Sequence, residues 1–309
     1  MNKNCLVVGA GGFIGFNLCL ELVDKYQNIY ACDNIFSKNI LQQLKDKDIK
    51  IIEGGVEGFL IAQKEYTHIE DIFYFAGNSV PALVETELER GCFSDQETLV
   101  MILSSFKKMK RKIKFVYGSS GGTVYGVTPN KSCDELTPCQ PISAYGLSKH
   151  IQEKYIQFYA KKLGFDYYIA RISNPYGRLL THGSKNLQGF IDNVVDKVLK
   201  KKEIEIWGDG SVVRDFIHID DLSSALYNLT ANTILSGIYN IGSGQATSLN
   251  DVITTIESLG RHINVVRLES RNIDVKVNVL DIKKIQQSTG WSPNTSMQIG
   301  LKNMINNTD

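Results

Sequence analysis

The glycine-rich stretch VVGAGGFIG, residues 7–15, decides the fold. It follows a short apolar run at residues 5–8 and opens an apolar helical pattern over residues 13–25. Glycines at every third position let a strand turn tightly into a helix whose N-terminus faces a phosphate. The stretch therefore predicts a dinucleotide-binding turn near the start of the chain.

Five residues of this turn are candidates for cofactor contact. Gly9 permits the tight turn, Gly12 lets the backbone approach a pyrophosphate, and Gly15 lets the helix pack closely on the strand. Phe13 and Ile14 open the helix, whose N-terminus attracts negative charge. The strand before the turn and the helix after it make this pattern much more specific than an isolated set of glycines.

The first 170 residues alternate apolar runs with helical patterns. The runs are apolar throughout, which is typical of strands buried on both faces of a parallel sheet. We expect strands at residues 5–8, 29–32, 49–52, 72–75, 113–117 and 167–170. The clearest helices are expected at residues 13–25, 98–110 and 144–163. This order predicts an α/β fold with a Rossmann-type doubly wound parallel sheet.

The pattern changes after Asn174, where turn residues become frequent and elements shorter. Helices are expected at residues 189–201, 220–231, 249–259 and 282–288, with strands at 204–207 and 238–241. We therefore expect an NAD(P)-binding domain over residues 1–173. A smaller C-terminal α/β substrate domain over residues 174–309 should be interleaved with it.

The residues that follow the second and fourth predicted strands are further cofactor candidates. Asp33, about 20 residues beyond the glycine turn, can accept a hydrogen bond from a ribose 2′-hydroxyl and would repel a 2′-phosphate. Asn34 extends the same turn, and Ala76 follows the fourth strand. NAD(H) is therefore the expected cofactor. Lys38 lies close enough to leave NADP(H) open.

Tyr145 and Lys149 are the catalytic candidates. They are four residues apart in a predicted helix and so share one face. A tyrosine hydroxyl has an ordinary pKa near 10, and a neighbouring ammonium should lower it by favouring the phenolate. The pair could then exchange a proton with a substrate hydroxyl while a nicotinamide exchanges hydride. Without the glycine turn, such a pair would be read as a solvated helix face.

Taken together, these motifs resemble an extended short-chain dehydrogenase/reductase of the NAD-dependent epimerase/dehydratase group, which acts on nucleotide sugars. The resemblance covers nearly the whole chain. Its motifs are GAGGFIG at 9–15, Asp33-Asn34, GSSGGTVYG at 118–126, Tyr145 with Lys149, RISNPYG at 171–177, WGDG at 207–210, RDFIHIDD at 214–221 and GWSP at 290–293.

The resemblance implies a serine or threonine that orients the reacting oxygen. The family position for this hydroxyl is occupied by Gly121, so Ser120 is the first candidate and Thr123 the second. The alternative is that Ser119 and Ser120 only bond the turn backbone.

The resemblance also implies four substrate-binding residues. Arg214 corresponds to the family arginine on the diphosphate, where a guanidinium can bind in a bidentate manner. Asn174 resembles the asparagine near the diphosphate. Arg271 and Asp274 resemble the arginine and acid that hold phosphate and ribose.

The reaction expected from the sequence is a reduction at carbon 4. A 4,6-dehydratase is disfavoured because its Asp-Glu pair is replaced by Gly122 and Thr123. Family contacts that retain the cofactor are missing from three places: Gly54-Gly55, Asn78-Ser79 and Gln96-Glu97-Thr98. Each loss removes roughly 1 kcal/mol.

Weaker retention favours an enzyme with exchangeable cofactor, which reduces a dTDP-4-dehydro-6-deoxyhexose for surface-polysaccharide synthesis. The alternative is an NAD-dependent UDP-hexose 4-epimerase, and a more remote one is a non-catalytic NAD-binding protein.

Composition narrows the class of partner. Lys and Arg total 34 and Asp and Glu total 33, so the formal net charge is +1 and favours neither nucleic acid nor a membrane surface. The six cysteines lack the paired spacing of a metal site or disulfide framework. No apolar run approaches the roughly 20 residues that cross a bilayer. We expect a cytoplasmic homodimer without a metal, whose ligand is a nucleoside-diphosphate sugar.

Overall fold

A computed structural model describes residues 3–77, 88–109, 112–128, 132–177, 189–269 and 275–306, with the side chains of residues 88–91 left out. A seven-stranded parallel sheet, in the order β11-β6-β5-β4-β1-β2-β3, runs through this part of the chain. Its strands are β1 (Asn4–Val8), β2 (Asn28–Asp33), β3 (Lys50–Glu53), β4 (Asp71–Tyr74), β5 (Lys114–Ser120), β6 (Asp166–Ile172) and β11 (Gly237–Ile241).

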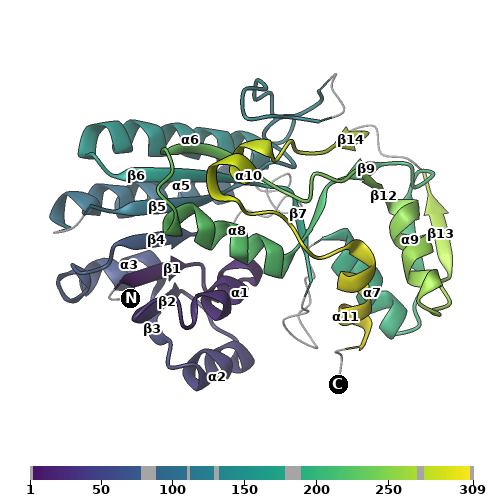
Figure 1. The fold of residues 1–309 in the computed structure, drawn as a ribbon, viewed down its shortest axis with the longest axis horizontal. Coiled ribbons are helices and arrows are strands. Elements are labelled where there is room, and N and C mark those ends of the chain that lie inside the picture. The colour runs from purple at the N-terminus through teal and green to yellow at the C-terminus, as the bar shows by residue number, and fades with distance from the viewer. Residues whose placement is uncertain are drawn as a thin grey trace.

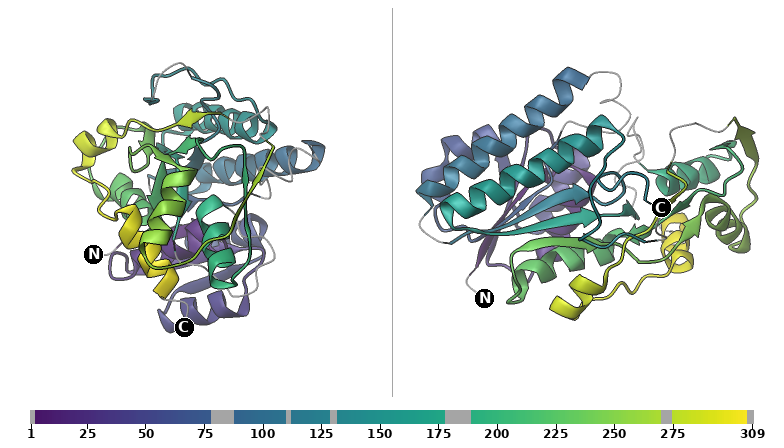
Figure 2. Two further views of the ribbon diagram at one scale, coloured as in Figure 1. Left: turned by 90° about the vertical axis from the view of Figure 1, so that its right-hand side faces the viewer. Right: turned by 90° about the horizontal axis from the view of Figure 1, so that it is seen from above.

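Helices cover both faces of this sheet (Figures 1 and 2). One face carries α1 (Phe13–Leu22), α2 (Lys38–Asp46) and α8 (Ile219–Ala231), and the other carries α3 (Gly55–Ile61), α5 (Leu88–Ser105) and α6 (Ala144–Leu163). Alternate residues of each strand face the two layers. In β1, Cys5 and Val7 join the core under α1 and α8, whereas Leu6 and Val8 join the core under α5 and α6. The doubly wound fold predicted from the sequence is confirmed.

The C-terminal part adds smaller sheets beside the large one (Figure 1). The pairs are β7 (Asn174–Tyr176) with β10 (Phe216–His218), β8 (Ile204–Trp207) with β13 (Val265–Leu268), and β9 (Val213–Arg214) with both β12 (Thr247–Ser248) and β14 (Val277–Asn278). The helices here are α7 (Phe190–Leu199), α9 (Leu249–Ser258), α10 (Lys283–Thr289) and α11 (Met297–Asn306). Three of them, α7, α9 and α11, share a separate apolar core with β8 and β10.

The C-terminal half also supplies part of the large sheet. β11 pairs in parallel with β6, from Gly237 opposite Tyr168 to Ile241 opposite Ile172. α8, which also belongs to the C-terminal half, packs on α1. The predicted boundary at residue 173 stays a prediction. In the described ranges, no helix has the length and apolar character needed to span a bilayer.

Candidate active site

The glycine turn joins β1 to α1 at the carboxyl edge of the sheet. Gly9 has φ +89°, and a Cβ there would lie 2.7 Å from the backbone nitrogen of Ala76. A Cβ on Gly15 would overlap the carbonyl oxygen of Gly9, so the helix can approach the strand only with glycine. At Gly12 the nearest atom would be 3.4 Å away, which leaves room in front of the backbone. The turn therefore exposes its backbone and the N-terminus of α1 to a ligand at this edge of the sheet.

A cavity of about 270 Å³ lies against this turn. The strand order reverses between β1 and β4, which is where doubly wound sheets bind their ligands. Five predicted cofactor residues line the cavity, namely Gly9, Gly12, Asp33, Asn34 and Ala76. Tyr145, Lys149 and Ser120 are not among its lining residues.

Asp33 holds the turn through both carboxylate oxygens. Oδ2 accepts a hydrogen bond from the Gly11 backbone nitrogen at 2.8 Å. Oδ1 accepts from the backbone nitrogens of Asn34 at 2.7 Å and Ile35 at 3.3 Å. The carboxylate therefore stabilises the cavity wall, and its contact with a ribose remains a prediction.

Tyr145 and Lys149 lie in the first turns of α6. Ser143 caps this helix by accepting a hydrogen bond from the Gly146 backbone nitrogen at 3.1 Å. Lys149 is 9% exposed, and its Nζ donates to the carbonyl oxygen of Gly118, in β5, at 3.0 Å. The same Nζ lies 5.8 Å from the centre of the Tyr145 ring and 5.0 Å from that of Tyr117. The ammonium is thus fixed between the tyrosine and the end of β5.

The prediction that Lys149 lowers the pKa of Tyr145 is wrong. Burial, together with the negative charge of Asp95, raises the pKa of Tyr145 to about 12. Burial lowers the pKa of Lys149 to about 8, although Asp95 and Glu153 oppose that change. The ammonium points to the Gly118 carbonyl rather than to the phenol, so removal from water dominates at the tyrosine.

Ser120 and Thr123 flank the family position of the hydroxyl, Gly121, at the end of β5. The carbonyl oxygen of Ser120 accepts from the backbone nitrogens of Thr123 and Val124, so β5 ends in a tight turn. Thr123 Oγ1 is buried and has no hydrogen-bond partner within the described structure. The Thr123 carbonyl oxygen packs against Gly146, next to Tyr145 in α6. Thr123 therefore stays a candidate beside Ser120, and its hydroxyl is the buried one that lacks a partner in the described part of the structure.

A buried polar network lies behind this turn. The guanidinium of Arg171 donates to Glu153 through Nε at 3.1 Å and Nη2 at 2.7 Å, and Ser119 Oγ donates to Glu153 Oε1 at 2.6 Å. His150 Nδ1 is 3.6 Å from Glu153 Oε2. Burial raises the pKa of Glu153, but the neighbouring His150 and the hydrogen bonds from Arg171 outweigh it and bring the pKa to about 2.

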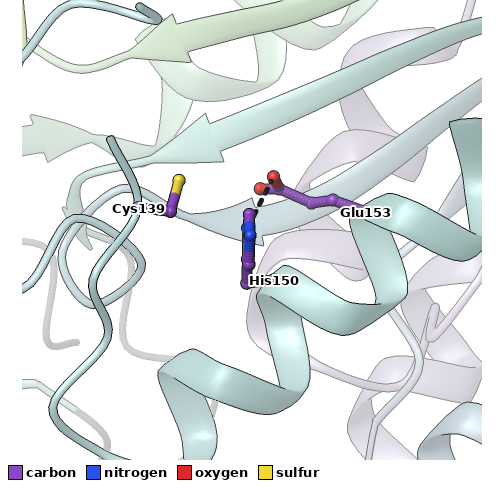
Figure 3. A group of neighbouring side chains, drawn as sticks. All are labelled: Cys139, His150 and Glu153. Carbon is purple, nitrogen blue, oxygen red and sulfur yellow. Dashed lines mark ion pairs between the residues drawn. The ribbon is translucent and has the colours of Figure 1, made fainter. Parts of the chain in front are cut away.

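Cys139, His150 and Glu153 bring atoms that could bind a metal within 4.8 Å of one another (Figure 3). Arg171 and Ser119 already occupy both oxygens of the carboxylate, and the guanidinium adds positive charge beside it. We therefore describe the cluster as part of the polar network and not as a metal site.

The predicted substrate residues fall in different parts of the structure. Asn174 begins β7, and its side-chain amide lies about 4 Å from a Cβ built on Gly122, beside the turn after β5. Arg214 lies in β9, and its Nη1 donates to the carbonyl oxygens of Val213 at 2.9 Å and Val275 at 2.6 Å. Arg271 and Asp274 lie outside the described residues.

Two acidic residues of this region were not expected from the sequence. Glu153 follows Lys149 by four residues, and that helical spacing was the available signal for a shared face. Asp95 belongs to α5 and lines the cavity with Thr98. No spacing within the sequence links it to the glycine turn.

A family model described as the NAD dependent epimerase/dehydratase family matches residues 5–242. The chain belongs to this family. It is 31% identical to a putative UDP-glucose 4-epimerase of Methanocaldococcus jannaschii over 97% of both chains. It is 29% identical to a dTDP-4-dehydro-6-deoxyglucose reductase of Escherichia coli, over 97% of this chain and 96% of the relative.

Among solved structures, a UDP-glucose 4-epimerase of Thermotoga maritima with UDP-glucose is similar with a TM-score of 0.88. It shares 27% identity and the match covers 98% of this chain and 97% of that one. The family and fold are therefore established, and the relatives named here all act on nucleotide sugars by their names.

Proposed function

We propose that this family member is an NAD-dependent nucleotide-sugar 4-epimerase whose substrate is a UDP-hexose. The observation that carries the proposal is the Tyr145–Lys149 pair, held at the end of β5 on the same sheet edge as the glycine-turn cavity. The sequence favoured a reductase, but the two epimerases described above support the alternative better.

The site fits a nicotinamide dinucleotide. Gly12 leaves room in front of the backbone, and the N-terminus of α1 favours a pyrophosphate there. Asp33 stands at the place where a ribose hydroxyl would lie and a 2′-phosphate would be repelled, which favours NAD over NADP. When bound, the nicotinamide supplies the acceptor and donor of a hydride at carbon 4.

The protein's own residues move the proton. Tyr145, as the phenolate, takes the proton of the sugar 4-hydroxyl as carbon 4 is oxidised, and it returns this proton to the keto oxygen when carbon 4 is reduced again from its other face. Lys149 supplies positive charge beside the phenol and is held in place by the Gly118 carbonyl. Ser120 or Thr123 donates a hydrogen bond to the same sugar oxygen.

The substrate diphosphate would be held from the C-terminal part of the chain. Asn174 is close to the turn after β5, and Arg214 brings a guanidinium, the group suited to phosphate oxygens, from β9. Arg271 and Asp274 complete this proposal from the family resemblance alone.

A homodimer is also proposed, through α5 and α6. These helices pack side by side and leave large apolar side chains exposed. Phe93 is 69% exposed, Leu147 50% and Phe158 60%. A second copy of the chain would cover them. Size-exclusion chromatography with light scattering, on wild type and Phe158→Lys, tests this.

The second candidate is the 4-keto reductase. Its support is the 29% identity to the E. coli reductase and the glycines at positions 54 and 55, where family members carry an acid toward adenine. An enzyme that exchanges its cofactor in every turnover does not need those contacts.

One experiment separates the two. The purified protein is denatured and the released nucleotide is quantified, and UDP-glucose is then incubated with native protein without added cofactor. About one NAD per chain together with UDP-galactose formation supports the epimerase. The reductase would replace the epimerase as the proposed function under three joint outcomes. The protein would retain no nucleotide, it would turn over no UDP-hexose, and it would oxidise NADH in the presence of a dTDP-4-keto-6-deoxyhexose.

A further inference from the structure

Asp95 is a buried carboxylate in the wall of the cavity. Asp95 is 5% exposed and lines the cavity together with Thr98, which belongs to the same helix, α5. Gly77 faces it, since a Cβ there would lie 3.1 Å from Asp95 Oδ2. The carboxylate therefore lies against the loop after β4, on the sheet edge that also carries the glycine turn.

The charge of Asp95 also reaches the catalytic pair. It adds to burial in raising the pKa of Tyr145, and it opposes burial at Lys149 by raising that pKa. Tyr74 of β4 and Tyr117 of β5 face the same charge, and burial followed by neighbouring charges raises their pKa values. Asp95 lines the cavity, and its charge acts on Tyr145 and Lys149, which do not line it.

We propose that Asp95 is a cofactor-site residue whose negative charge favours the oxidised, cationic nicotinamide over the reduced, neutral one. The inference rests on the proposed function, because it requires a nicotinamide dinucleotide in the cavity. The two forms of the cofactor differ by one positive charge on the ring and share both ribose rings, the pyrophosphate and the adenine. A buried carboxylate in the wall of the cofactor cavity therefore stabilises the cationic form more than the neutral one.

This preference suits an epimerase. Each cycle starts by removing hydride from carbon 4, so the enzyme must begin with the oxidised form. The family contacts that are missing from residues 54–55 and 96–98 are neutral or adenine-directed, and they do not distinguish the two oxidation states. Asp95 would supply that distinction from α5.

The test compares affinities rather than activity. Asp95→Asn keeps the size of the side chain and removes its charge. Glu97→Gln removes the same charge from an exposed position of the same helix, where water screens it. For wild type and both variants, the dissociation constants of NAD⁺ and NADH are measured by calorimetry after retained nucleotide has been stripped, with thermal unfolding as a control for folding.

We expect the preference for NAD⁺ over NADH to fall roughly tenfold in Asp95→Asn, the change in ratio that an electrostatic difference of about 1.4 kcal/mol produces. Glu97→Gln should keep the wild-type ratio. Any effect of the substitution on pyrophosphate binding cancels in this ratio, because NAD⁺ and NADH both carry the pyrophosphate. Asp95→Ser, which also lacks the charge, takes the place of the asparagine variant if that variant does not fold.

An unchanged ratio in Asp95→Asn, with both dinucleotides still bound, would overturn the inference and leave the proposed function standing. A wild-type protein that binds neither dinucleotide overturns the proposed function, and the inference fails with it.

Discussion

Replacing Glu153 by glutamine should change how the stability of the fold depends on pH. The Glu153 side chain is 0% exposed and bonds Arg171, so its charge is little screened by water. Its pKa falls from the ordinary 4.5 to about 2 in the folded protein, since the neighbouring His150 and the hydrogen bonds from Arg171 outweigh burial. This difference corresponds to about 3 kcal/mol of stability.

The sign of this pH dependence follows from which state of the protein binds the proton of Glu153 more tightly. The unfolded chain binds a proton at Glu153 more readily than the folded protein does, so the stabilisation is complete above about pH 4.5 and is lost as the pH falls towards 2. At pH 3.5 roughly 1 kcal/mol should already be gone. At neutral pH, Glu153→Gln should cost about 3–5 kcal/mol because it leaves Arg171 buried without its anion.

Urea unfolding of wild type and Glu153→Gln at pH 7, 5 and 3.5 measures both effects. Glu97→Gln, on an exposed carboxylate, gives the background from other titrating groups. The difference in unfolding free energy between wild type and Glu153→Gln should narrow by roughly 1 kcal/mol from pH 7 to 3.5. A gap that stays constant over this range would refute an ionised, strongly paired Glu153.

Three further predictions concern the candidate catalytic residues in α6 and in the turn after β5. Tyr145→Phe should lower kcat by about 10²–10⁴-fold while NAD binding, measured by calorimetry, stays within about threefold; activity within tenfold of wild type would remove Tyr145 from the mechanism. Lys149, whose pKa burial lowers to about 8, should lose its charge above that pH, so kcat/KM should fall there, and a flat profile from pH 7 to 9.5 would contradict this. Thr123→Val should reduce kcat more than Ser120→Ala, because Thr123 Oγ1 is the buried hydroxyl that lacks a partner in the described structure; the reverse order in steady-state kinetics would assign the role to Ser120.

Elements that depend on local pattern were predictable from the sequence. The predicted helix at 144–163 coincides with α6 (Ala144–Leu163), and the strand at 204–207 coincides with β8 (Ile204–Trp207). The predicted helix at 98–110 is α5 (Leu88–Ser105), which begins ten residues earlier. Continuous apolar runs and capping residues are read within a few positions, so they carry over to the structure.

Interactions between distant segments were not predictable in the same way. The pairing of Glu153 with Arg171 joins a helix to a strand, and neither residue differs by pattern from a surface charge. Burial and the charge of Asp95 raise the pKa of Tyr145, whereas the sequence predicted that it would fall. Burial could not be read from the sequence, because it depends on the folded chain. Asp95 reaches the cavity only through the packing of α5 on the sheet.

The pairing of β11 with β6 has a consequence for biosynthesis. A nascent chain that has left the ribosome only as far as β6 lacks the neighbour for that strand, because Gly237–Ile241 is made about 65 residues later. Until then the N–H and C=O groups along one side of β6 stay open to pairing with another chain. Premature stop codons upstream of β11 should therefore yield aggregating fragments, not a free-standing nucleotide-binding half.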